Sequence, residues 1–155
     1  SVMKYNLMLI YHRVNEPGLA LDKVNELLQQ KGVELRKDLY ASLRIYNLLL
    51  HYDLNNMLLL ESAVRAAKNF LQTRDMYFEL EKLVLKHFLK LINSADQQAR
   101  SKVLQTMRAE VLELTENDPR EKNLLQNVEL LNWIDATSAG LSMHDHLELK
   151  SAINR

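Results

Sequence analysis

The chain contains no cysteine, and its 155 residues include only three glycines and two prolines. Without cysteine there is no disulfide, no thiolate zinc site and no cysteine nucleophile, and the absence suits a reducing compartment. Glycine and proline interrupt helices, whereas the abundant leucine, glutamate, lysine and alanine favour them. We therefore expect an all-α protein.

Neither sign of charge is in excess, because 20 Lys and Arg side chains balance 20 Asp and Glu side chains. A formal net charge of zero creates no overall field that would attract nucleic acid or an anionic membrane. No apolar run approaches the roughly 20 residues that cross a bilayer, and the first residues do not resemble a signal peptide. We expect a cytoplasmic protein with no nucleic-acid partner and no membrane insertion.

The length suits one domain, covering residues 1–155, with a hydrophobic core of its own. The sequence starts at Ser1 and enters an apolar helical pattern at once. We expect this domain to be a fragment of a longer protein.

The most apolar stretch, residues 43–71, contains two helical patterns separated by Asn55 and Asn56. Asparagine ends helices because it tolerates the left-handed conformation and competes for backbone hydrogen bonds. Apolar side chains surround most of the first helix, so it needs neighbours on several sides.

Similar breaks occur near residues 32, 55, 74, 94, 118 and 140. Short connections at such regular intervals predict antiparallel helical hairpins. The first four expected helices cover residues 2–15, 21–31, 34–54 and 57–72. The fifth lies between the breaks at 75 and 94, and the sixth lies between those at 94 and 118. The seventh covers residues 118–136, and a short segment follows after 142. Ser94 is predicted to cap the sixth helix, Trp133 to lie at the edge of the seventh, and the tail from Lys150 to fray.

The turn over residues 51–57, with Tyr52 and Asp53 before the two asparagines, is similar to the inter-helix turn of tetratricopeptide repeats. Residues 43–91 also resemble the C-terminal helical-repeat region of bacterial tetratricopeptide-like proteins. The pattern departs from the family at Asn55, where glycine is usual, and its repeats exceed the family's roughly 34 residues. The resemblance implies hairpins stacked as a tetratricopeptide-like superhelix, and a helical bundle is the alternative.

Four side chains of the central stretch are candidates for a binding groove: Tyr46, Leu50, His51 and Arg65. They would face a partner if the helix that carries the first three is the inner one of its pair. The alternative is that Tyr46 and Tyr52 are core aromatics with hydrogen-bonded hydroxyls, with His51 at the rim.

Other polar motifs favour solvated surfaces over reaction centres. His144 and His146 form the only local cluster of metal-ligand types, and a helix start in solvent is the favoured interpretation. Lys82, Lys86 and Lys90 share one helix face, which suits either phosphate binding or ordinary solvation. His12 and His87 have no sequence neighbour that would make a catalytic unit. We expect no metal and no cofactor.

These patterns predict a non-enzymatic protein-interaction or scaffold module that holds a protein or peptide in a concave helical groove. The alternative is a structural or oligomerisation domain of a larger protein, which docks, or forms a homodimer, through an apolar end face on the first helix. That face consists of Met3, Leu7, Ile10 and Tyr11. An enzyme would instead require a deep polar pocket between helices.

Overall fold

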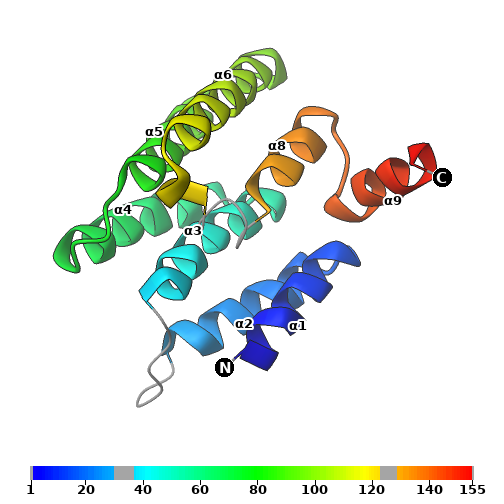
Figure 1. Cartoon of the computed structure of the whole chain (residues 1–155). Coiled ribbons are helices and arrows are strands. Elements are labelled where there is room, and N and C mark those ends of the chain that lie inside the picture. The colour runs from blue at the N-terminus through cyan, green and yellow to red at the C-terminus, as the bar shows by residue number, and fades with distance from the viewer. Residues whose placement is uncertain (1, 30–36, 123–128, 155) are drawn as a thin grey trace.

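The computed structural model describes residues 2–29, 37–122 and 129–154, which form α-helices and one short 3-10 helix but no strand (Figure 1). This confirms the all-α class. The predicted break at residue 32 lies outside the described residues. The elements are α1 (Val2–Arg13), α2 (Pro17–Gln29), α3 (Lys37–Asp53), α4 (Met57–Thr73), α5 (Glu79–Ile92), α6 (Gln97–Asn117), η1 (Pro119–Glu121), α8 (Leu130–Ser138) and α9 (Met143–Ile153).

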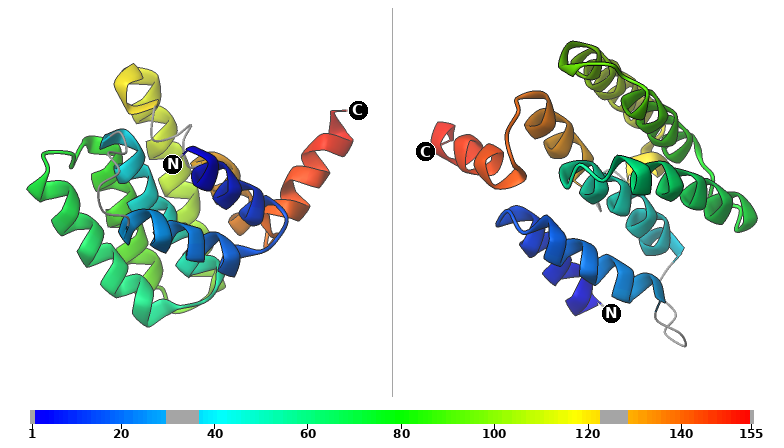
Figure 2. Two further views of the ribbon diagram at one scale, coloured as in Figure 1. Left: turned by 90° about the horizontal axis from the view of Figure 1, so that it is seen from below. Right: turned by 180° about the vertical axis from the view of Figure 1, so that it is seen from behind.

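The helices from α1 to α6 pack as consecutive hairpins, each against the next one along the chain. α8 then packs on α6, and α9 contacts both α8 and α1, so the last helix returns to the first (Figures 1 and 2). Arg13 Nε donates to Glu129 Oε2 over 3.2 Å, and His144 Nδ1 donates to the Arg13 carbonyl over 3.1 Å. In a strictly linear stack of hairpins these ends would stay apart. The tetratricopeptide-like superhelix therefore stays a prediction.

α3 is the central helix, because it packs against α2, α4 and α5. Its largest buried apolar side chains are each worth about 1.5–3 kcal/mol when removed from water. The buried residues of α3 are Leu39, Ala41, Ser42, Leu43, Ile45, Tyr46, Leu48, Leu49 and Leu50. The expectation that this helix has neighbours on several sides is confirmed.

Three of the predicted breaks contain a residue in the left-handed region: Asn55 at φ 58°, Asp75 at φ 54° and Gly140 at φ 70°. The start of α9 is also as expected, since Ser142 Oγ accepts from the backbone N–H of Asp145 over 3.1 Å. Local turn and cap chemistry therefore located these boundaries correctly.

Other boundaries differ from the predictions. Asp96, not Ser94, caps α6, because its Oδ1 accepts from Ala99 N over 2.8 Å while Ser94 Oγ donates to the Lys90 carbonyl. The long helix predicted over residues 118–136 is wrong, since Glu129 has φ 52° and α8 begins only after it. α9 does not fray at Lys150 but continues to Ile153.

α1 carries two apolar stripes, and the structure buries the one that the sequence pattern did not favour. Tyr5 and Met8 are buried together with His12, whereas Met3 and Ile10 are 79% and 52% exposed. Both stripes have helical spacing, so periodicity alone does not decide which one faces the core.

Trp133 is 1% exposed and lies in the core, which corrects its predicted position at a helix edge. Its indole stacks on Phe88 of α5 with ring centroids 5.5 Å apart and meets Tyr52 of α3 edge-on, also at 5.5 Å. The aromatic cluster of Tyr52, Phe88 and Trp133 thus joins α3, α5 and α8.

Candidate functional site

The four candidate groove residues do not form one surface. Tyr46 and Leu50 are fully buried, so they cannot line a groove. His51 is partly buried, which lowers its pKa, and its Nδ1 lies 3.5 Å from Asn56 Nδ2. Arg65 is exposed on α4, where it donates to Glu61 over 2.9 Å.

His12 is not isolated, because the fold brings Tyr46 and Asp53 of α3 to its two ring nitrogens. Nδ1 lies 2.5 Å from the Tyr46 hydroxyl, and Nε2–H donates to Asp53 Oδ2 over 2.6 Å. The other carboxylate oxygen, Asp53 Oδ1, accepts from the Trp133 indole N–H over 2.9 Å. We call His12, Tyr46, Asp53 and Trp133 the Asp53 network.

The Asp53 network links a carboxylate, an imidazole and a hydroxyl in the order found in catalytic relays. The Tyr46 hydroxyl at its end is nevertheless buried, so a substrate cannot reach it. Tyr46 is 1% and His12 3% exposed. Burial chiefly raises the pKa of the Tyr46 hydroxyl, which stays protonated and donates to His12 Nδ1. An attacking nucleophile needs contact with a substrate, so Tyr46 does not supply one. The geometry instead satisfies buried polar groups on three helices.

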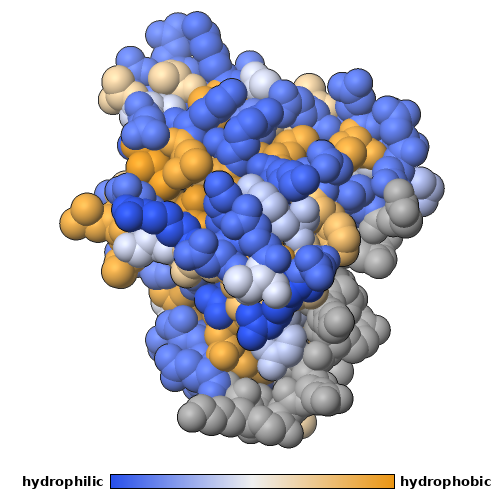
Figure 3. Space-filling model, turned by 90° about the vertical axis from the view of Figure 1, so that its left-hand side faces the viewer, coloured by the Kyte–Doolittle hydropathy of each residue, from blue (hydrophilic) through white to orange (hydrophobic). Residues whose placement is uncertain are grey.

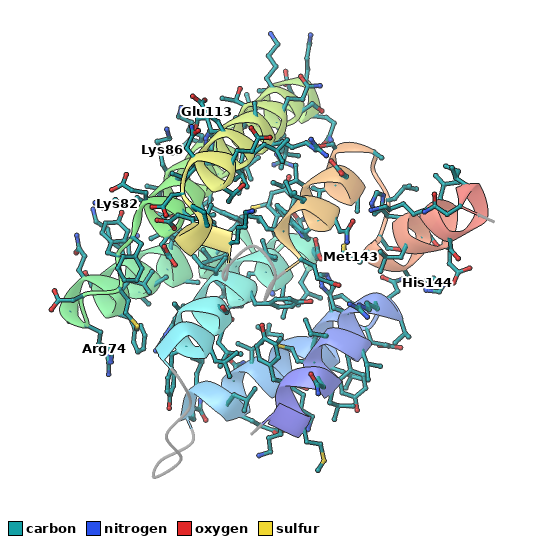
Figure 4. The ribbon with its side chains drawn as sticks, viewed as in Figure 1. Arg74, Lys82, Lys86, Glu113, Met143 and His144 are labelled. Carbon is teal, nitrogen blue, oxygen red and sulfur yellow. The ribbon has the colours of Figure 1, made fainter. Side chains whose placement is uncertain are left out.

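The larger of the two described pockets is a cleft of about 430 Å³ between α5 and α6. Lys82 and Lys86 line it from α5, and Glu113 lines it from α6 (Figure 4). Leu83 and Leu114, both partly buried, add apolar surface from the two helices. We call this feature the α5–α6 cleft.

His87, the second histidine expected to be isolated, also has a partner. Its Nε2–H donates to Glu110 Oε2 in the α5–α6 cleft over 2.6 Å, and its ring is fully buried. Burial lowers the pKa of His87, while the hydrogen bond from His87 lowers the pKa of Glu110. A neutral imidazole that donates to a carboxylate agrees with both pKa shifts. The buried Nδ1 has no partner among the described residues, and in this tautomer it carries a lone pair and needs no acceptor.

The positive charge of the lysine stripe, formed by Lys82, Lys86 and Lys90 of α5, is partly neutralised by glutamates of α5 and α6. Lys82 Nζ lies 3.2 Å from Glu79, and Lys86 Nζ lies 3.3 Å from Glu110. Exposed pairs of this kind are worth about 0–1 kcal/mol, so either lysine can exchange its partner at little cost. These lysines can therefore exchange their glutamate partners for groups of a ligand, but they do not create a concentrated positive field.

His144 and His146 do not converge on a third ligand. His144 Nδ1 donates to the Arg13 carbonyl, and the buried His146 Nε2 has no hydrogen-bond partner in the part of the chain that the structure describes. Within residues 2–29, 37–122 and 129–154, no group of three or more His, Asp or Glu side chains is arranged to hold a metal ion.

Comparison with known proteins adds no relative: no family model, curated protein or solved structure matches this chain. Among the described helices, none combines the length and the apolar character needed to cross a membrane.

The Asp53 network predicts a stability cost for removing a single hydroxyl. In Tyr46→Phe, His12 Nδ1 loses its donor inside the core, so the free energy of unfolding should fall by about 1–3 kcal/mol. Urea denaturation followed by far-UV circular dichroism measures it. Tyr11→Phe is the matched control on a partly buried side chain of α1, and a similar loss in both variants would contradict this role of the hydroxyl.

Glu81 of α5 is a buried carboxyl group, 4% exposed, with no hydrogen-bond partner for Oε2 among the described residues. Burial, with a smaller contribution from the charge of Glu121, raises its pKa from 4.5 to about 7. The folded protein therefore holds the proton more tightly than the unfolded chain. This contribution to stability is complete below pH 4.5 and is lost as the pH rises through 7.

We predict that Glu81→Gln is more stable than the parent at pH 8, by up to about 3 kcal/mol, because the amide cannot ionise. At pH 4.5 the two proteins should differ little. Urea denaturation at both pH values checks this, with Glu113→Gln as the exposed control. A difference between parent and Glu81→Gln that does not change with pH would show that the Glu81 carboxyl titrates normally.

Proposed function

We propose that this chain is a non-enzymatic interaction module that binds a helical segment of a partner protein in the α5–α6 cleft. Two neighbouring helices with apolar side chains between charged edges form the kind of surface into which an amphipathic helix packs. The single observation that carries the proposal is the α5–α6 cleft, with Leu83 and Leu114 between Lys82 and Lys86 on one helix and Glu113 on the other.

The charges of the cleft suggest the chemistry of its partner. Lys82 and Lys86 lie on α5 and favour acidic side chains along one edge of a bound helix. Glu113 on α6 has no ion pair with another described residue and favours a basic side chain on the opposite edge. Apolar residues between these edges would contact Leu83 and Leu114. A tetratricopeptide-like origin would agree with such a role.

The second candidate function is docking through α1, as a structural or oligomerisation domain. Met3 and Ile10 are exposed, although Leu7 and Tyr11 are partly covered by the protein itself. Sedimentation equilibrium separates the two functions. A dimer that dissociates in Ile10→Glu would favour docking through α1.

The proposed function is tested with helical peptides selected from a displayed library against the folded protein. We expect Lys82→Glu/Lys86→Glu to weaken the dissociation constant of selected peptides at least about tenfold, because both lysines are exposed contacts of the cleft. Fluorescence anisotropy gives the constant, and circular dichroism confirms the fold of each variant.

Lys68→Glu/Lys102→Glu is the matched control, with the same charge change on exposed residues outside the cleft. It should bind as the parent does. If both double variants lose the same affinity, the effect is one of net charge, and if neither loses affinity, the peptides bind elsewhere. Either outcome would refute the cleft as the binding surface.

A further inference from the structure

A second, smaller pocket of about 250 Å³ lies where three parts of the chain meet. It is formed by the α3–α4 turn, the first turn of α6 and the turn between α8 and α9. Its volume lies below the roughly 300–1,000 Å³ of sites for drug-sized ligands, so a matching ligand is small. We call it the turn pocket.

Arg100 of α6 is the cation of the turn pocket, and its guanidinium has neither a hydrogen bond nor an ion pair with any other described side chain. Its Nε is closed to solvent and has no acceptor. The Nη nitrogens are the part of the guanidinium that a ligand can contact. The unpaired guanidinium in the lining therefore favours a carboxylate at this side of the pocket.

Asp53 is the anion of the same pocket, and it does not neutralise Arg100. Its two carboxylate oxygens accept from His12 and Trp133, which hold the side chain in place. No Arg100 nitrogen lies within 4.0 Å of these oxygens. The Asp53 network thus keeps two opposite charges apart on the lining of one small pocket.

A ligand with one charge is a poor match for this lining. Arg100 would attract a simple anion, but Asp53 would repel it. Asp53 would attract a simple cation, but Arg100 would repel it. A zwitterion satisfies both groups. Asn55 and Thr137 add uncharged hydrogen-bonding side chains, and Leu141 adds an apolar wall.

We propose that the turn pocket binds a free α-amino acid, with the ligand carboxylate on Arg100 and the ligand ammonium on Asp53. The Nη nitrogens of the guanidinium donate to the ligand carboxylate in charge-assisted hydrogen bonds. The ammonium donates to Asp53 oxygens that keep lone pairs beyond those used by His12 and Trp133. This site is separate from the α5–α6 cleft and does not depend on the proposed function.

The test uses the indole N–H of Trp133, which gives one resonance because the chain has a single tryptophan. This group donates to Asp53, so an ammonium bound at Asp53 should shift the resonance. The standard L-amino acids are titrated one by one into nitrogen-15-labelled protein. We expect a saturable shift with at least one amino acid, and at least about tenfold weaker binding of its N-acetyl and its amide derivatives.

Arg100→Gln should weaken the amino acid at least about tenfold. Lys102→Gln, which removes the same charge from an exposed position on α6, should bind as the parent does. Three results would overturn the proposal: no saturable shift with any amino acid, equal binding of the N-acetyl or amide derivatives, or unchanged binding in Arg100→Gln. A shift produced equally by acetate or inorganic phosphate would show a plain anion site and would also overturn it.

Discussion

The carboxylate of Asp53 is the constraint on which the arrangement of the helices depends. It lies at the end of α3 with a side chain 23% exposed, and a charge so covered needs donors. They come from His12, 41 residues before it in the chain, and Trp133, 80 residues after it. Because these donors belong to α1 and α8, satisfying one carboxylate ties both helices to α3. α9 contacts both of these helices.

Hydrogen bonding to Asp53 distinguishes the polar groups with a structural role from those that line a pocket. His12 and Tyr46 are buried behind Asp53 and serve its hydrogen bonding, so a histidine, a tyrosine and a carboxylate in contact do not here imply catalysis. Other polar side chains line two separate pockets. Lys82, Lys86 and Glu113 border the cleft between α5 and α6, and Arg100 lies in the pocket where three turns meet. Glu113 in the first and Arg100 in the second have no ion pair with another described residue.

Local chemistry in the sequence predicted much of this fold. Asn55, Gly140 and Ser142 marked their boundaries correctly, and the apolar pattern of residues 43–54 identified the central helix. Contacts between distant residues were not predictable. His12 and His87 had no partner nearby in the sequence, and each found a carboxylate on another helix. α1 had two stripes of similar apolar character, so only packing against α2 and α9 determines its orientation. The candidate groove failed for the same reason, because Tyr46 and Leu50 face neighbours that periodicity cannot identify.

The central claim is that the Asp53 network makes α1, α3 and α8 one cooperative unit. Native-state hydrogen exchange under increasing denaturant tests it most directly, because it gives an opening free energy for each helix. Our account predicts that the core amides of α1 around Met8 and of α8 around Trp133 exchange with the same opening free energy and denaturant dependence as those of α3 around Tyr46. Separate opening of α1 or α8, at a lower free energy than α3, would contradict it.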